Sequence, residues 1–127
     1  MKQLDAGAWK SPKYAGERIP TLEEVVQTIP DGKKLFIEIK TEAEILPELK
    51  RVLAATGRPP AQTPLISFSY ETMRAAKEQL PDLKAYWVVK LDKNKDTGRM
   101  NYTVEELIAK AKAANLDGLE LGNSPAL

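Results

Sequence analysis

The sequence predicts an α/β fold with a parallel sheet, as found in (βα) barrels and doubly wound sheets. Segments with the period-two pattern of strands alternate with segments of helical periodicity, in the order strand and helix three times over and then a strand. The connections between strands are long enough for parallel crossovers. Four strands are too few for either complete fold. Because a full (βα)8 barrel takes about 250 residues, a chain of 127 residues holds roughly half of one.

The composition suits one packed domain and excludes several kinds of site. Hydrophobic residues make up 43% of the chain, and its net charge of +1 provides no global field to attract nucleic acid or an acidic membrane. The chain has no Cys, which excludes disulfides, thiolate metal sites and cysteine nucleophiles, and no His, the side chain best suited to proton transfer near neutral pH. No run approaches the roughly 20 apolar residues of a membrane span. Catalysis would depend on carboxylates, Lys, Tyr or an oxygen-ligated metal, or on a histidine from elsewhere.

Residues 1–33 are expected to form a loop and a short helix, followed by the βα units of residues 34–127 in the same partial domain. The first 20 residues are polar, rich in turn formers and without a regular period. A capping box then predicts a short helix to about Thr28, because the Thr21 hydroxyl can accept from the Glu24 amide while the Glu24 carboxylate accepts from the Thr21 amide.

Residues 34–40 alternate in polarity and predict the first strand. One face of this strand would carry Leu35, Ile37 and Ile39, and the other would carry Phe36, Glu38 and Lys40. A second capping box, from Thr41 to Glu44, and apolar residues at spacings of three, four and seven predict an amphipathic helix over residues 42–56, which Gly57 would end.

The rest of the chain repeats this pattern. The remaining predicted strands are residues 65–69, 83–89 and 119–121, and the remaining helices are residues 71–80 and 103–115. A third capping box, from Thr103 to Glu106, starts the last helix. The loop before it is basic, but Asp92 and Asp96 dilute its charge and no aromatic residue interleaves with its lysines. Nucleic acid is therefore not expected as a partner.

Glu38 and Lys40 are the most informative candidate site residues. Strands of parallel sheets are ordinarily buried on both faces and read as continuous apolar runs. These two charges instead share a face at the carboxyl end of a strand, where the active sites of (βα) barrels lie, and burying them would cost several kcal/mol unless they pair or bind ligands. They predict a carboxylate for a hard metal ion and a lysine for a phosphate or another anion. The alternative is a plain Glu–Lys pair on a solvated or edge strand.

Three further residues, Ser67, Trp87 and Glu120, are candidates for lining a pocket. Ser67 and Ser69 alternate at a strand end, although the better explanation for Ser69 is the N-cap of the next helix. Trp87 would be a platform for substrate or, as is more common for an aromatic residue in a strand, part of the core. Glu120 lies at the end of the last strand and would face inward if its neighbours there pack against helices.

Several segments, taken in order, resemble the glycerophosphodiester phosphodiesterase family. They are residues 4–9 (Leu-Asp-Ala-Gly-Ala-Trp), residues 16–25 (with Ile-Pro-Thr-Leu-Glu-Glu), residues 35–40 (Leu-Phe-Ile-Glu-Ile-Lys) and residues 66–69 (Ile-Ser-Phe-Ser). The resemblance covers essentially the whole chain but only the middle of the family's catalytic domain. It implies a partial TIM barrel that has four parallel strands and lacks the first two and the last two.

The same resemblance implies an enzyme of lipid metabolism that hydrolyses glycerophosphodiesters to an alcohol and glycerol 3-phosphate with a divalent cation, usually Mg²⁺ or Ca²⁺. Glu38 would be one of three carboxylate ligands of the cation, and Lys40 would face the phosphate. The family's Glu-x-Asp metal ligands and its two catalytic histidines precede the region matched by residues 4–9. No acid–base catalyst is therefore expected in this chain, and the cation is not expected to bind it tightly.

Two hypotheses follow for the 127-residue chain. In the first, it is an inactive part of a metal-dependent phosphodiesterase whose substrate is a small glycerophosphodiester. In the second, it is a non-catalytic half-barrel, a binding or regulatory module that self-associates through its open sheet edges.

Overall fold

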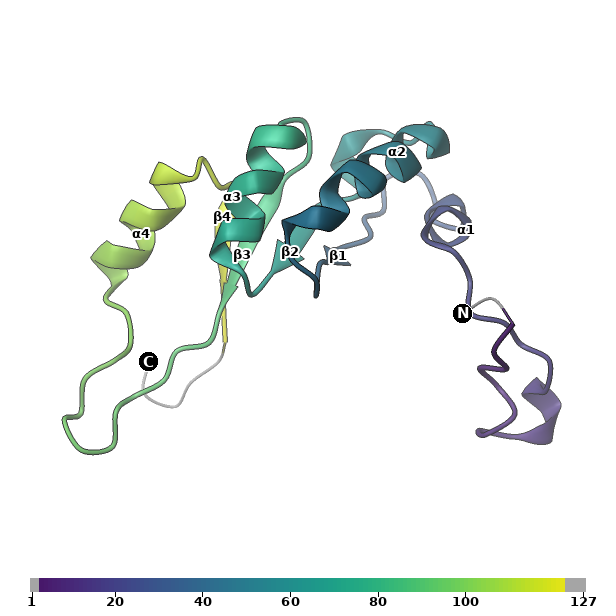
Figure 1. Cartoon of the computed structure of the whole chain (residues 1–127), viewed down its shortest axis with the longest axis horizontal. Coiled ribbons are helices and arrows are strands. Elements are labelled where there is room, and N and C mark those ends of the chain that lie inside the picture. Colours follow the sequence, from purple (N-terminus) through teal and green to yellow (C-terminus); the bar gives the residue numbers. More distant parts are fainter. Residues whose placement is uncertain (1–2, 123–127) are drawn as a thin grey trace.

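A computed structural model describes residues 3–122 and shows a four-stranded, entirely parallel sheet with the strands in chain order (Figure 1). The strands are β1 (Ile37–Glu38), β2 (Leu65–Ser67), β3 (Ala85–Val89) and β4 (Gly118–Leu121). Helices alternate with these strands, and the sheet is open. The predicted partial α/β fold of the TIM-barrel type is therefore confirmed.

Four α-helices accompany the sheet, and none within residues 3–122 is long and apolar enough to cross a membrane. They are α1 (Leu22–Gln27), α2 (Leu46–Thr56), α3 (Tyr70–Gln79) and α4 (Val104–Ala113). Residues 3–20 form an arm apart from the sheet, and residues 90–101 form a long loop beyond the end of β3 (Figure 1).

The starts of three helices confirm the predicted caps. In α1 the Thr21 hydroxyl accepts from the Glu24 amide at 3.2 Å, and the Glu24 carboxylate accepts from the Thr21 amide at 2.8 Å. The same reciprocal pair of bonds joins Thr103 and Glu106 at α4. Ser69 caps α3, since its hydroxyl accepts from an amide in the first turn.

The predicted capping box at Thr41 is wrong. The chain instead enters α2 through a 3₁₀ turn over Ala43–Ile45, whose N-cap residue is Glu42 and lacks a side-chain cap. Pro47 explains the difference, because its missing N–H cannot bond the Ala43 carbonyl that a regular helix starting at residue 42 requires. The other end of α2 follows the prediction, with Gly57 in the left-handed conformation at φ 65°.

The first strand is shorter than the predicted residues 34–40. The amides of Leu35, Ile37 and Ile39 still donate to the carbonyls of the neighbouring chain segment, at 2.7–2.9 Å. However, a parallel ladder would return a bond to the Leu35 carbonyl from residue 64, which is a proline without an N–H. The regular ladder is therefore limited to Ile37–Glu38.

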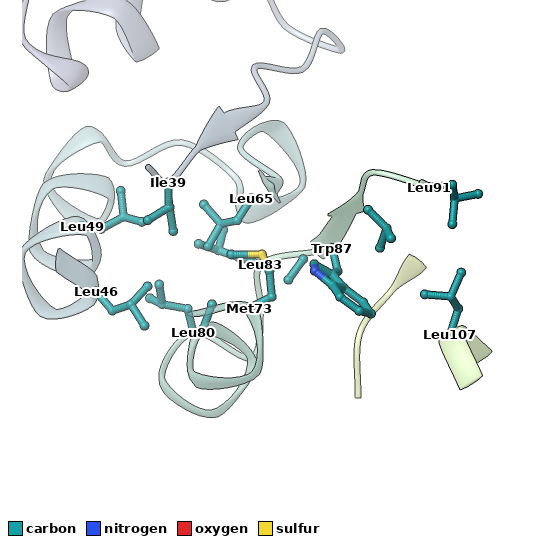
Figure 2. Packing of buried hydrophobic residues seen from close by; sticks show 13 residues of the cluster. Ile39, Leu46, Leu49, Leu65, Met73, Leu80, Leu83, Trp87, Leu91 and Leu107 are labelled. Carbon is teal, nitrogen blue, oxygen red and sulfur yellow. The ribbon is translucent and has the colours of Figure 1, made fainter. Parts of the chain in front are cut away.

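The core lies between the sheet and the helices on one of its faces. Side chains from α2, α3 and α4 meet those of β2 and β3, as Figure 2 shows for Leu46, Leu49, Leu65, Met73, Leu80, Trp87 and Leu107. The alternating burial of β3 follows from this arrangement, since every second side chain points to the helices.

A partly buried ion pair ties α3 to the starts of β3 and β4. The Lys77 side chain is only 9% exposed, and its Nζ donates to an Asp117 carboxylate oxygen at 2.9 Å and to the carbonyl oxygens of Pro81 and Leu83. The same Asp117 oxygen accepts from the Ala85 amide at 2.9 Å. Burial acts to raise the pKa of Asp117, but the hydrogen bonds from Ala85 and Lys77 outweigh it, and the net pKa is lowered.

The N-terminal arm is organised by Asp5. One carboxylate oxygen accepts from the amides of Gly7 and Ala8, both at 2.9 Å, and the other accepts from the Gly16 amide at 2.8 Å. The bond from Gly16, followed by those from Ala8 and Gly7, lowers the pKa of Asp5. Gly7 is required here because a Cβ at that position would lie 2.1 Å from the Tyr14 carbonyl oxygen.

Candidate functional site

The candidate site is a groove of about 500 Å³ at the carboxyl ends of β1 and β2. Its lining residues are Glu38, Ile39, Lys40, Thr41, Glu42, Ser67, Phe68 and Ser69. Strand β1 contributes Glu38 directly and Lys40 two residues beyond it, so their side chains project from the same face. The groove therefore brings a carboxylate and an ammonium group to the end of the sheet where (βα) barrels place their active sites.

Glu38 and Lys40 are both exposed, because no described helix covers their face of the sheet. Within residues 3–122, neither side chain forms a hydrogen bond or an ion pair, and they do not pair with each other. This contrasts with Lys77, which is almost completely buried and paired. The charges of Glu38 and Lys40 are thus free to contact a ligand.

The same face of the sheet carries apolar side chains on the amino-terminal side of the groove. The strand register places Glu38 beside Ile66, and Ile66 beside Tyr86. Phe36 lies two residues before Glu38, and its ring centroid is 6.1 Å from the centroid of the Tyr86 ring. A shallow depression of about 560 Å³ lies among Phe36, Ile66, Tyr86, Leu119 and Glu120.

Ser67 reaches the groove but its side chain has a structural role there. The residue is buried, and its hydroxyl donates to the Ile39 carbonyl at 2.9 Å while accepting from the Ser69 amide at 3.0 Å. These bonds join the ends of β1 and β2 and fix the backbone that lines the groove.

Trp87 lies on the opposite face of the sheet, against the helices. It is only 4% exposed, and its ring makes edge contacts with Tyr70 and Tyr102 at centroid distances of 5.1 and 5.6 Å. Its indole Nε1 donates to the Phe68 carbonyl at 3.0 Å. Trp87 therefore packs in the core, and its indole contacts the backbone of the groove from the face of the sheet that the helices cover.

Glu120 shares the face of Glu38 but lies far from it. Its partner in the register is Val88 on β3, and β2 and β3 separate its strand from β1. Three strand spacings of about 4.8 Å, measured across the sheet, therefore separate the backbones of the two residues. Glu38 and Glu120 also line different depressions of the sheet.

Glu38 fits the role of one ligand for a hard divalent cation, because an exposed and unpaired carboxylate is the oxygen donor that such ions prefer. Within the described residues, however, no three acidic, His or Cys side chains gather closely enough to hold a metal ion. Residues 3–122 thus offer a cation one good ligand rather than a complete site. The ligand-binding roles of Glu38, Lys40, Ser67, Trp87 and Glu120 stay predictions.

Sequence reasoning missed Phe68, although the residue lies in one of the segments that carry the family resemblance. Its side chain is 62% exposed and lines the groove beside Lys40. The signal was present in the alternation of the strand: if Ile66 shares the face of Glu38, then Phe68 shares the face of Lys40.

Two curated proteins named glycerophosphodiester phosphodiesterase are similar to this chain. The protein from Caldanaerobacter subterraneus subsp. tengcongensis is 36% identical over 88 residues, which are 66% of this chain and 36% of that protein. The protein from Bacillus subtilis is 30% identical over 99 residues, which are 65% of this chain and 34% of that protein. No protein-family model matches the chain.

The chain thus spans about a third of the length of the curated relatives it matches. The similarity extends over about two thirds of this chain. The structure of this chain shows parallel βα units, with the charges of Glu38 and Lys40 exposed at the carboxyl end of β1. The chain is thus similar to glycerophosphodiester phosphodiesterases over about two thirds of its length, which supports the resemblance to that family.

Proposed function

We propose that this chain supplies a cation-binding carboxylate, Glu38, and a phosphate-binding lysine, Lys40, to a metal-dependent phosphoric diester hydrolase. The reaction would convert a glycerophosphodiester and water to an alcohol and glycerol 3-phosphate. The observation that supports this most is the position of the two unpaired charges in one groove at the carboxyl ends of β1 and β2. The names of the two similar proteins favour the same reaction.

Each residue has a distinct part in this proposal. Glu38 would hold a Mg²⁺ or Ca²⁺ ion through its carboxylate oxygens, and a bound cation would offset the negative charge of the phosphodiester. Lys40 would donate from its ammonium group to a non-bridging phosphate oxygen and so fix the phosphate against β1. These contacts orient and neutralise the ester, but they transfer no proton.

Proton transfer is the part of the reaction that the 127 residues do not provide. General acid–base catalysis contributes about 10² to 10⁴ in rate, and the chain contains no His. We expect the purified chain to hydrolyse glycerophosphocholine no faster than a buffer blank with added Mg²⁺. A rate near that of an intact relative would contradict the proposed division of roles.

Binding of inorganic phosphate tests the proposal directly. We expect phosphate to shift the backbone amide NMR signals of residues 38–42 and 67–69 in the wild-type chain. Lys40→Gln should weaken this binding about tenfold or more, because the substitution removes the charge from the groove. Lys34→Gln is the matched control, since Lys34 is an exposed lysine near the other end of the same segment and should leave binding unchanged. Equal effects of the two substitutions would overturn the role of Lys40.

A second candidate function is a non-catalytic half-barrel that self-associates. It is favoured by one observation: the sheet face opposite the helices carries two exposed aromatic residues, Phe36 at 53% and Phe68 at 62% exposure. Parallel sheets are almost always covered on both faces, and a second copy of the chain would cover this one.

A further inference from the structure

We infer that Phe68 forms an apolar subsite for the three-carbon glycerol arm of the phosphate ester, directly beside the phosphate contact at Lys40. This inference rests on the proposed function, because it assigns the organic part of the ligand whose phosphate binds at that groove. Neither the strand pattern nor the similarity to known proteins assigns this residue a role.

The placement of Phe68 follows from the strand register. Ile37 pairs with Leu65 and Glu38 with Ile66 in a parallel ladder. The Ile39 amide continues that ladder by donating to the Ile66 carbonyl at 2.9 Å. Lys40 and Phe68 follow directly after this bond, Phe68 in a bend just past the end of β2, and both line the same groove. An ester whose phosphate contacts Lys40 therefore has its first carbon atoms within reach of the Phe68 ring.

The backbone of Phe68 is held on both sides, so its side chain projects from a fixed segment of chain. Its carbonyl oxygen accepts from the Trp87 indole at 3.0 Å, and Trp87 is itself packed between two tyrosines. The adjacent Ser69 amide donates to the Ser67 hydroxyl at 3.0 Å, and Ser69 also caps α3. A rigidly placed group loses little conformational freedom when a ligand binds, which favours recognition.

The ring of Phe68 has no packing role that would explain its presence. It is 62% exposed, and within residues 3–122 it takes part in none of the aromatic or cation–π contacts made by other rings. Phe36 is a useful comparison because it is exposed on the same face but lies near Tyr86 and lines the other depression. Of these two phenylalanines, Phe68 is the one that lines the groove with Glu38 and Lys40.

The chemistry of a glycerophosphodiester suits this pair of neighbours. The phosphate is an anion that an ammonium group recognises, whereas the glycerol arm presents C–H groups that can pack against the face of an aromatic ring. Inorganic phosphate has the first feature and lacks the second. The two ligands therefore separate the subsite at Phe68 from the charge at Lys40.

The test compares inorganic phosphate with glycerol 3-phosphate in NMR titrations of the 127-residue chain. Phe68→Ala should weaken glycerol 3-phosphate binding by about fivefold and leave inorganic phosphate binding unchanged. Phe68→Leu keeps an apolar side chain and should give an intermediate loss, and it also serves if the alanine variant loses its fold. Phe36→Ala is the matched control and should change neither affinity. Lys40→Gln should weaken both ligands.

The outcomes distinguish this inference from the proposed function. If Lys40→Gln weakens both ligands while neither Phe68 substitution changes the affinity for glycerol 3-phosphate, the apolar subsite is refuted and the phosphate site stands. If the wild-type chain binds neither ligand, or if Lys40→Gln has no effect, the phosphate site fails and the subsite beside it fails too. Equal losses for both ligands in Phe68→Ala would also overturn the subsite, because they would show a general change in the groove.

Discussion

At the scale of single residues, the chain treats its charges in two opposite ways. Lys77 donates to Asp117, and backbone groups supply three further hydrogen bonds to the pair near the amino ends of β3 and β4, away from the candidate site. Glu38 and Lys40 lie at the carboxyl end of β1 and contact no charged group within the described residues. A paired, buried charge stabilises a fold only while its partner is present, whereas an unpaired, exposed charge is available to a ligand.

The ion pair predicts a loss of stability in Asp117→Asn. The substitution leaves the Lys77 ammonium group with two carbonyl oxygens and no anion. Because the Asp117 carboxylate is partly exposed to solvent, this should lower the free energy of unfolding by about 1 kcal/mol. Urea denaturation followed by circular dichroism measures the change. Asp31→Asn is the control, because Asp31 is fully exposed and pairs with Arg58 at 3.4 Å, a contact worth little. Equal losses in the two variants would refute the importance of the pair.

The lowered pKa of Asp117 predicts a pH dependence of stability. Its pKa in the folded chain lies below the ordinary value of an aspartate side chain, so the carboxylate binds protons less readily when folded than when unfolded. The stabilisation is therefore complete above the unfolded pKa and is lost as the pH falls through the folded pKa. Between about pH 5 and about pH 3, the wild type should lose more stability than Asp117→Asn. Asp5 and Glu48, whose pKa values are also lowered, contribute equally in both proteins. Parallel pH profiles would contradict this assignment.

The residue pattern alone predicts that Glu38 and Lys40 lie together at the carboxyl end of a strand, because charges are rare on strands of parallel sheets, and both line one groove there. The pattern does not determine the surroundings of Ser67, Trp87 and Phe68. Their roles depend on which face of β2 and β3 the helices cover, and hence on packing between segments distant in sequence. The face occupied by Trp87 also determines that its indole N–H meets the Phe68 carbonyl.

At the scale of elements, helix starts show what local sequence can and cannot determine. Capping boxes are written into four consecutive residues, so the starts of α1 and α4 could be predicted from the sequence. The box at Thr41 failed because Pro47, three residues beyond the motif, removes a hydrogen bond of the first turn. Likewise β1 is short because Pro64 lies beside it in the sheet. Pro64 is 27 positions away from Ile37 in sequence, but the Ile37 amide donates to its carbonyl.

The two kinds of helix start predict different responses to the same substitution. Thr103→Ala removes the hydroxyl that accepts from the Glu106 amide and should cost about 1 kcal/mol of stability. Thr41→Ala removes no cap and should change stability by less than about 0.5 kcal/mol. Urea denaturation of both variants measures the difference. A loss at Thr41 as large as that at Thr103 would show that the box does form in solution.

At the scale of the whole molecule, the main feature is a parallel sheet with helices on one face only. Periodicity predicted the parallel order of its strands because each element carries its own hydrophobic pattern. The completeness of the metal site could not be judged from any single element, since ligands from separate strands must converge. Glu38 and Glu120 lie on β1 and β4, the two edge strands of the sheet.

The uncovered face predicts concentration-dependent association of the chain. Phe36→Asp places a charge among the exposed apolar side chains of this face and should reduce the association measured by size-exclusion chromatography with light scattering. Ile108→Asp is the control, because Ile108 is an exposed apolar residue on α4 and its substitution should leave association unchanged. A wild-type chain that stays monomeric at all concentrations would refute the self-associating module.

The different surroundings of the two tryptophans give the protein a built-in optical reporter. Trp9 is 82% exposed on the N-terminal arm, whereas Trp87 is 4% exposed and hydrogen-bonded to the backbone of the groove. In Trp9→Phe, emission would come from Trp87 alone and would be blue-shifted in the native state. Its fluorescence would then report the unfolding of the core. It would also report any displacement of the Phe68 backbone when a phosphate ester binds, so that one label-free signal would measure both stability and ligand binding.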